Sequence, residues 1–247
     1  MNRNDSAGDR VILREDPLAP SATGLAGRLK RLGFCIALAA EEGELCRQLD
    51  RGQGPQALLL NTALSAGEIA ATLKFAGDAI RKGRVTPLAV GATPGLAARE
   101  ALARGSLTLA ALDPLDDATL RFQVNRAFLT TREAGQARRE VRVPWEAPVA
   151  FLSEGRERRA ALYNFSRHGA FLETVRPVQP GSAVEFSLPL PLGTSRIRGE
   201  VVHTNAPGNL RRPRAPVGIG VRFEPLPEAD LAELDAAVAN RCAALLL

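Results

Sequence analysis

Two short segments in the second half of the sequence carry side chains suited to binding a small anion. The run RREVR supplies three arginines, Arg138, Arg139 and Arg142. Guanidinium groups donate forked hydrogen bonds to phosphate oxygens and to guanine O6 and N7, and they stack on purines. The stretch NFSRHG begins with Asn164, 22 residues after Arg142. Asn164 and Ser166 can bind a base or ribose, and Gly169 permits close backbone approach because it lacks a Cβ.

The elements around these segments predict how they are brought together. Beyond about residue 150, short apolar runs such as RRAALYNF, GAFLET, SAVEFSLPL, RIRGEVVHT and VGIGVRF are separated by Gly, Pro and Asn turns. This pattern favours a closed antiparallel β-barrel, and EADLAELDAAVANRCAALLL predicts a C-terminal helix that packs on it. The arginine run precedes the first barrel strand, and NFSRHG ends the next strand. If these two strands pair, both segments lie at the same end of the barrel.

The first half has a different pattern, in which short apolar runs alternate with helical stretches. The apolar runs are VIL, FCIALAA, ALLLN, PLAVGA and LTLAAL. Five such units predict an α/β domain with a doubly wound parallel five-stranded sheet. We therefore expect a flexible N-terminus over 1–10, the α/β domain over 11–130, an Arg-rich linker over 131–142 and the barrel with its helix over 143–247.

Composition agrees with two folded domains and an anionic ligand. Of 247 residues, 45% are hydrophobic and 24% charged, and 32 Lys and Arg against 27 Asp and Glu give a net charge of +5. Cys35, Cys46 and Cys242 have neither the number nor the spacing of a disulfide framework or a zinc site, and we expect reduced core thiols. No run approaches the roughly 20 apolar residues that cross a bilayer, so we expect a cytoplasmic protein without a membrane span.

The two segments, followed by GAFLE, GEVVHT and VGIGVRF, resemble the PilZ domain over roughly residues 136–240. The paired RxxxR and (D/N)xSxxG motifs of that family bind the bacterial second messenger cyclic di-GMP. The resemblance implies that Arg138 and Arg142 grip guanine and phosphates with help from Arg139. It also implies that the floor of the site is formed by Asn164, Ser166 and Gly169. Asn164 stands where many members have Asp, which removes a negative charge. His203 stands where an Arg is common.

The first half resembles the receiver domain of two-component response regulators, without the residues of its chemistry. The family's acid pair, phosphoacceptor Asp, Ser or Thr, and Lys correspond here to Glu15 with Asp16, Asn61, Gly91 and Asp113. An amide is not a carboxylate nucleophile, Gly has no hydroxyl, and Asp113 replaces a cation. The resemblance implies a pseudo-receiver that serves for protein interaction or dimerisation. A receiver-like fold of unrelated history is the alternative.

Together these features predict a non-enzymatic cyclic di-GMP effector that couples nucleotide binding to domain rearrangement and to a protein partner. We expect no catalytic residues, no metal and no cofactor beyond the ligand; a homodimer is an open possibility. One alternative is a PilZ-type interaction module that binds no nucleotide, with the arginines as a solvated hinge and Asn164 and Gly169 as a β-turn. Another is nucleic-acid binding by the arginines, which 4% aromatic content and the lack of a recognised motif disfavour.

Overall fold

The computed structural model describes residues 10–15, 24–51, 56–132, 140–190, 193–208 and 214–245. The expected flexible segment 1–10, except for Arg10, and linker residues 133–139 lie outside this range. The chain divides into two compact units, with the boundary between Ala137 and Arg138. Leu245 belongs to the first unit, where its carbonyl accepts hydrogen bonds at 3.1 Å from the backbone N–H of Ala110 and the side chain of Gln123.

The first unit is built on a parallel sheet. Its strands are β1 (Arg10–Arg14), β2 (Ile36–Ala39), β3 (Gln56–Asn61), β4 (Val85–Gly91) and β5 (Leu109–Leu112). Its helices are α1 (Leu25–Arg31), α2 (Glu42–Arg51), α3 (Ala66–Arg81), α4 (Leu96–Arg104) and α5 (Asp117–Arg132). The strand order is β2-β1-β3-β4-β5, and every neighbouring pair is parallel. The predicted doubly wound five-stranded sheet is confirmed.

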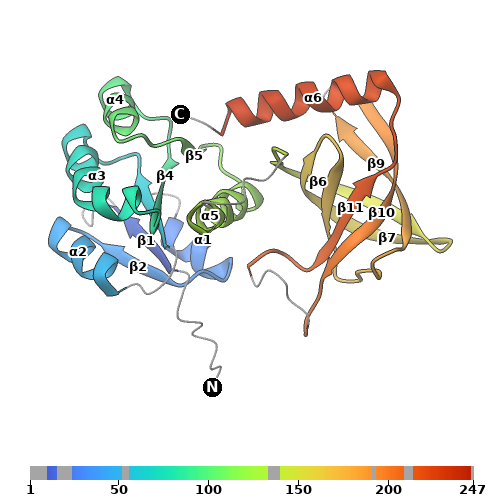
Figure 1. Cartoon of the computed structure of the whole chain (residues 1–247), viewed down its shortest axis with the longest axis horizontal. Helices are drawn as coiled ribbons and strands as arrows, with labels where there is room; N and C mark the ends of the chain where they lie inside the picture. The colour runs from blue at the N-terminus through green and yellow to red at the C-terminus, as the bar shows by residue number, and fades with distance from the viewer. Residues whose placement is uncertain are drawn as a thin grey trace. The chain divides into compact units, whose positions relative to one another are not determined.

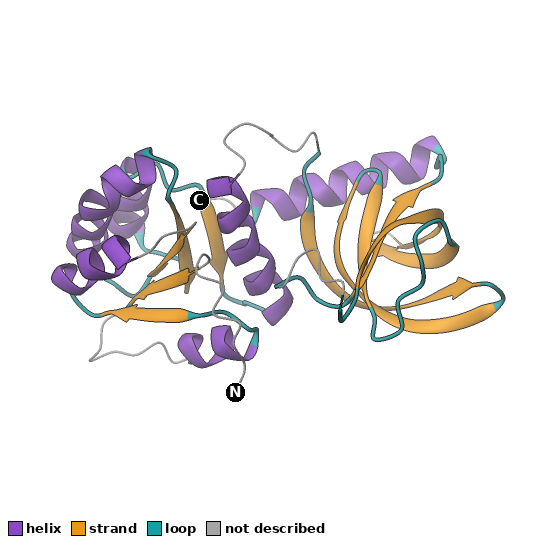
Figure 2. Ribbon diagram, turned by 60° about the horizontal axis from the view of Figure 1, so that its bottom comes forward, coloured by secondary structure: helices purple, strands orange, loops and turns teal. Residues whose placement is uncertain are grey.

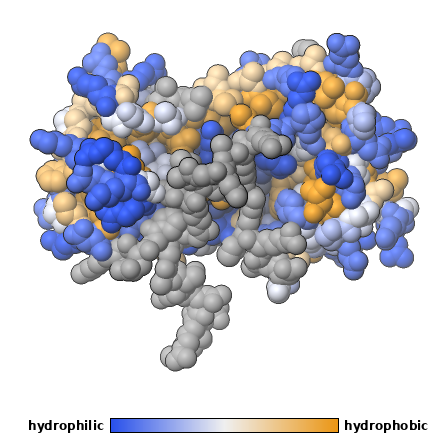
Figure 3. Space-filling view, viewed as in Figure 1, coloured by the Kyte–Doolittle hydropathy of each residue, from blue (hydrophilic) through white to orange (hydrophobic). Residues whose placement is uncertain are grey.

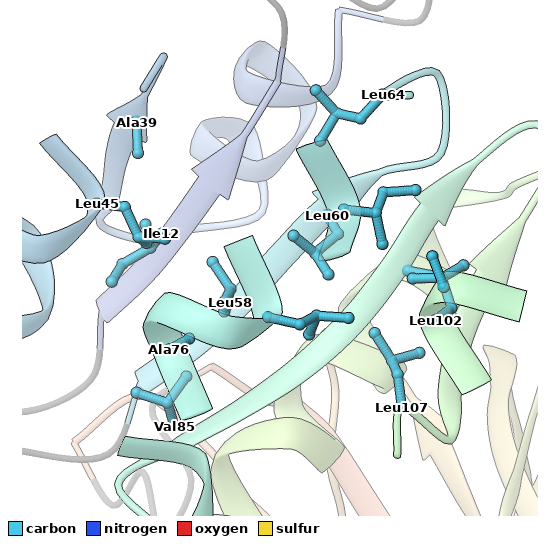
Figure 4. Close-up of a cluster of buried hydrophobic side chains, with 14 of the residues drawn as sticks. Ile12, Ala39, Leu45, Leu58, Leu60, Leu64, Ala76, Val85, Leu102 and Leu107 are labelled. Carbon is cyan, nitrogen blue, oxygen red and sulfur yellow. The ribbon is translucent and has the colours of Figure 1, made fainter. Parts of the chain in front are cut away.

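Helices cover both faces of this sheet because its strands are apolar on both sides. Leu58 and Leu60 of β3 point into a core formed with α2, α3 and α4, whereas Leu59 points into a second core formed with α1 and α5. Figure 1 shows the two helical layers on either side of the sheet. Figure 4 shows the first core, where Leu58 lies near Ala76 of α3 and Leu45 belongs to α2.

The second unit is a closed antiparallel barrel. Its strands are β6 (Val143–Ser153), β7 (Arg156–Ser166), β8 (Gly169–Glu173), β9 (Ala183–Leu190), β10 (Gly193–Asn205) and β11 (Gly218–Phe223). Around the barrel the order is β10-β11-β8-β7-β6-β9. The helix α6 (Glu228–Ala243) packs against β6, β7 and β9. Figure 2 shows the curved strands with the helix alongside them, and the predicted barrel with its C-terminal helix is confirmed.

Alternating side chains fill the barrel. Phe151 and Phe165 are fully buried between the strands, and Leu234 of α6 is buried as well. The β6–β7 hairpin closes through Glu154 and Gly155, whose φ values of 52° and 70° are those of a two-residue type I′ turn. On the face shown in Figure 3 both units carry mostly hydrophilic side chains with scattered apolar ones, as is usual for a protein surface.

One expectation about the cysteines was wrong. Cys35 is exposed, and Cys46 and Cys242 are half-buried; all three are free thiols. The reason at Cys35 is alternation, because its neighbour Phe34 is buried against the second core and directs Cys35 outward. Within the described residues, no helix is both long enough and apolar enough to cross a membrane.

Candidate functional site

The two segments predicted to form a site meet where β6 begins and β7 ends. Pro144 pairs with Asn164 across the β6–β7 ladder, and this register brings Arg142, two residues earlier, next to the end of β7. The Nη1 of Arg142 donates a hydrogen bond of 3.0 Å to Oδ1 of Asn164. Asn164 is buried and Arg142 is half-buried. The last arginine of the run and the first residue of the predicted floor are therefore in direct contact.

Gly169 opens β8 at a point where the barrel leaves no room for a side chain. A Cβ on this residue would lie 2.5 Å from the carbonyl oxygen of Val221 on β11 and 3.3 Å from Nη2 of Arg142. Ser166 is fully buried, and its hydroxyl donates to the carbonyl oxygen of Gly169 at 3.2 Å. The Gly169 backbone thus lies next to the Arg142 guanidinium, and Ser166 holds the turn that places it there.

Glu140 forms a second attachment between the arginine run and the turn. Its Oε1 accepts the backbone N–H of His168 at 2.9 Å and lies 2.8 Å from Nδ1 of the same residue. The carbonyl of His168 accepts the backbone N–H of Phe223 at 2.8 Å, which fixes the turn to β11. Sequence reasoning missed this contact. Its signal was a single acidic residue between Arg139 and Arg142 in the run RREVR.

Helix α6 also contacts this end of the barrel. Arg167, in the turn after β7, forms an ion pair of 2.7 Å with Asp235 of the helix. Arg241 donates from Nε to the carbonyl oxygen of Pro144 at 3.2 Å, near the start of β6. The predicted ligand residues Arg138 and Arg139 lie outside the described residues. The structure therefore brings together four of the six predicted ligand residues, namely Arg142, Asn164, Ser166 and Gly169.

Of the predicted degenerate positions, Asn61 and Gly91 end β3 and β4, and Glu15 and Asp113 follow β1 and β5. The carboxyl ends of these parallel strands lie at one edge of the sheet. Asn61 is buried, and its Oδ1 accepts the backbone N–H of Ala63 at 3.0 Å. A Cβ on Gly91, which has a φ of 121°, would lie 2.8 Å from the hydroxyl of Thr62 and 3.3 Å from Oδ1 of Asn61. The Thr62 hydroxyl, which donates to the carbonyl of Ala92 at 2.7 Å, thus fills the space of a side chain at position 91.

Arg14 places a buried cation at the same edge, and sequence reasoning did not single it out. It ends β1, and its Nη1 donates to the backbone carbonyl oxygens of Ala39 and Ala40. Its Nη2 lies 3.8 Å from the carboxylate of Glu68 and 4.0 Å from that of Glu42. The signal in the sequence was an arginine at the end of the apolar run VIL.

Glu68 belongs to a capping box at the start of α3. Its backbone N–H donates to the hydroxyl of Ser65 at 3.2 Å, and its carboxylate accepts the backbone N–H of Ser65 at 2.9 Å. Hydrogen bonds from the side chain and the backbone of Ser65, with a smaller contribution from Arg14, lower the pKa of the Glu68 carboxyl below its ordinary value. The cap and the buried arginine thus share one carboxylate.

The remaining predicted positions do not assemble into a metal site within the described part of the chain. Glu15 is half-buried, Asp113 is exposed, and Asp16 lies outside the described residues. Among the described residues no group of three His, Cys, Asp or Glu side chains is arranged to hold a metal ion. At this edge the described polar side chains include the amide of Asn61 and the guanidinium of Arg14.

Residues 136–240 match the model of the PilZ domain family. This match and the sheet order of the first unit confirm the predicted combination of a receiver-like unit and a PilZ domain. No curated protein matches the chain.

Among solved structures, the chain is similar to the receiver domain of the sensor histidine kinase PA1611 from Pseudomonas aeruginosa, with 21% identity, coverage of 49% of this chain and 98% of that chain, and a TM-score of 0.41. The chain is also similar to the PilZ domain of YcgR from Escherichia coli, solved with c-di-GMP. The identity is 18%, the match covers 43% of this chain and 92% of that chain, and the TM-score is 0.33. A third similar structure is the Inhibitor of motility from Bacillus subtilis. The identity is 20%, the match covers 44% of this chain and 53% of that chain, and the TM-score is 0.35.

Proposed function

We propose that this chain, whose residues 136–240 form a PilZ domain, is a signalling effector that binds cyclic di-GMP at the start of β6 and the end of β7. The observation that carries the proposal is the contact of Arg142 with Asn164 beside the side-chain-free backbone of Gly169. This arrangement places a guanidinium fork and an amide side by side at one end of the barrel, next to the closely packed backbone of Gly169. A cyclic dinucleotide offers phosphate oxygens and guanine edges that match these groups.

The residues have distinct roles in this proposal. Arg142 donates to the phosphates or to guanine, together with Arg138 and Arg139 from the preceding segment. Asn164 orients Arg142 and offers its amide to the base or ribose. Ser166 does not contact the ligand in this proposal. Its buried hydroxyl donates to the carbonyl of Gly169 and stabilises the turn that holds the site. The chain contributes binding groups only, and the proposal contains no catalytic step.

Isothermal titration calorimetry of the full chain with cyclic di-GMP tests the proposal. We expect a dissociation constant in the micromolar range or lower, because each charge-assisted hydrogen bond contributes roughly 1.5–3 kcal/mol. Cyclic di-AMP serves as a control, since adenine lacks the O6 acceptor that an arginine fork recognises in guanine. Absence of heat and of saturation at about 100 μM cyclic di-GMP would support the alternative of a PilZ module that binds no nucleotide.

We further propose that the ligand orders the arginine run and thereby signals to the rest of the protein. Glu140 and Arg142 attach the end of the run to the turn through His168 and Asn164. Ligand phosphates would neutralise the like charges of the three arginines and hold the run in place, at an ordering cost of roughly 1–2 kcal/mol per residue. Hydrogen exchange should show increased protection over 134–143 and 164–169 on addition of cyclic di-GMP. Equal protection in the free and bound protein would refute this coupling.

In the same proposal the first unit is a pseudo-receiver that binds a protein partner or a second copy of the chain. Three receiver positions support this part of the proposal. Asn61 has an amide in place of a nucleophilic carboxylate, and Gly91 has no hydroxyl, while Thr62 fills the space beside it. Asp113 has an exposed carboxylate in place of a cation. Size-exclusion chromatography with light scattering tests the homodimer arm. A monomer at high concentration would leave a different protein as the partner.

A further inference from the structure

A second basic region lies on the barrel, at the other end of β7 from the proposed nucleotide site. It is a cleft of about 490 Å³ lined by the first residues of β7 and by the segment after β8. Four of its lining residues are arginines, Arg156, Arg158, Arg159 and Arg176. We call this region the arginine cleft. Eight residue steps of about 3.3 Å along β7, roughly 26 Å, separate Arg156 from Asn164, so the cleft and the nucleotide site are distinct.

Among the described residues that line the arginine cleft, positive charges outnumber negative ones. Glu157 is the one acidic residue that lines it, against four arginines. Within the described part of the chain none of the four guanidinium groups forms an ion pair, whereas Arg196, Arg198 and Arg222 elsewhere on the barrel each pair with a glutamate. The Nε of Arg158 is buried and has no hydrogen-bond partner among the described residues. The cleft therefore has unused capacity for an anionic ligand.

Among the described residues, the first part of β7 also has a strand partner on one side only. Residues 156–160 pair with β6, through contacts that run from Ser153 with Arg156 to Val149 with Ala160. Pairing of β7 with β8 starts only at Ala161, opposite Glu173. On this side, the carbonyl of Arg159 accepts the hydroxyl of Thr174 at 2.9 Å, which shows that the backbone of Arg159 faces away from β6.

In an antiparallel strand, residues two positions apart direct their N–H and C=O groups to the same side. The N–H and C=O of Glu157 therefore face away from β6, as those of Arg159 do. Figure 1 shows the yellow tip of the β6–β7 hairpin extending past its neighbours. A free edge of this kind can accept another strand. Val175, which is 90% exposed, adds an apolar contact at the rim.

We propose that the arginine cleft binds an acidic segment of a partner protein, which adds in extended form to the edge of β7. Charge decides which strand is accepted, because the arginines repel a basic strand and stabilise carboxylates at alternate positions. A strand-width edge favours a peptide over a nucleic acid, which would need a longer basic track to contact successive phosphates. The proposal does not depend on cyclic di-GMP binding.

The test uses the full chain and a fluorescent seven-residue probe peptide of alternating Glu and Val, followed by fluorescence anisotropy. We expect saturable binding that weakens as salt is added. The same peptide with Lys in place of Glu should not bind. A peptide with Pro at two central positions should bind at least tenfold more weakly, because Pro removes the donors that pair with β7. Equal binding of the Pro peptide, or no saturable binding of the Glu and Val peptide, would overturn the proposal.

Matched variants locate the site. The double variant R156Q/R158Q should weaken peptide binding tenfold or more. R196Q/R222Q, which removes the same charge from exposed ion pairs elsewhere on the barrel, should change it by less than about twofold. Both variants should bind cyclic di-GMP as the unmodified chain does, so failure here is distinguishable from failure of the nucleotide site. An equal loss in the two double variants would overturn the assignment to the cleft.

Two further measurements do not depend on a variant. Hydrogen exchange of the unmodified chain should show the amides of Glu157 and Arg159 becoming protected when the Glu and Val peptide is added. Unchanged exchange at both amides would rule out strand addition. A single-stranded oligonucleotide should compete weakly with the peptide. Tight competition by the oligonucleotide, lost in R156Q/R158Q, would overturn the peptide proposal in favour of nucleic-acid binding.

Discussion

Arg142 and Asn164 are joined by a hydrogen bond of 3.0 Å between a guanidinium nitrogen and an amide oxygen, although 22 positions separate them in sequence. The β6–β7 register creates this contact, since it sets Pro144 opposite Asn164. The bond orients the fork of Arg142 at the edge of the turn before any ligand is present. A preoriented arginine loses less conformational entropy on binding, which favours affinity.

Replacing Arg142 by Ala should therefore reduce the affinity for cyclic di-GMP about tenfold or more, since one charge-assisted bond is worth at least 1.4 kcal/mol. Calorimetry measures the change. Arg142→Lys should recover only part of the affinity, because Lys lacks the bidentate fork. Arg196→Ala, at an exposed ion pair, is the control and should bind normally. Unchanged affinity in Arg142→Ala would move the nucleotide site elsewhere.

Gly169→Ala should destabilise the barrel by roughly 1–3 kcal/mol, because its Cβ would overlap the carbonyl oxygen of Val221. The same methyl group would press on Nη2 of Arg142, so nucleotide affinity should fall in the folded fraction. Gly193→Ala is the matched control, because no described atom beyond its chain neighbours lies within 4 Å of its Cβ position. Urea denaturation and calorimetry measure both effects. Equal stability of the two variants would show that β11 yields to the added methyl.

Ser65→Ala should destabilise the first unit by about 1 kcal/mol at neutral pH, since it removes the side-chain half of the α3 capping box. Glu68 has a pKa below its ordinary 4.5, so its contribution is present above that value and is lost as pH falls through the lowered pKa. The difference between Ser65→Ala and the unmodified chain should therefore shrink in acid.

Urea denaturation at about pH 7 and about pH 3 measures this effect, with the exposed Ser187→Ala as control. A difference that grows in acid would be inconsistent with the role assigned to Glu68.

The first unit should take no phosphoryl group from acetyl phosphate in the presence of magnesium. Asn61 is an amide, and Asn61→Asp alone should not restore the reaction, because Asp113 would repel an aspartyl phosphate that a cation normally stabilises. Intact-mass spectrometry detects an adduct, with a competent receiver protein treated in parallel. A phosphoryl adduct on any residue of 11–130 in the unmodified chain would contradict the pseudo-receiver proposal.

The sequence predicted the architecture because periodicity is a local property. Apolar runs separated by helical stretches specified the parallel sheet, and short runs between Gly and Pro turns specified the barrel. The order of RREVR and NFSRHG also predicted that the two segments lie at the same end of the barrel, because two strands joined by a short turn bring their outer ends together; the hydrogen bond between Arg142 and Asn164 came only from the structure. The same local patterns do not indicate whether a residue next to a strand points into the core or toward solvent. For this reason Cys35 was expected in the core, whereas it is exposed.

Only the tertiary structure decided the contacts that depend on side-chain direction and strand register. The sequence alone predicted a receiver-like unit with an amide, Asn61, at the end of its third strand, and an arginine motif that lies near a small polar turn. It did not show that Thr62 fills the space next to Gly91, or that Glu140 binds His168. Nor did it show that β8 pairs with β7 only from Ala161 onward, beside four arginines that form no ion pair with any described residue. These features arise from residues distant in sequence, whose proximity is set by packing and not by spacing.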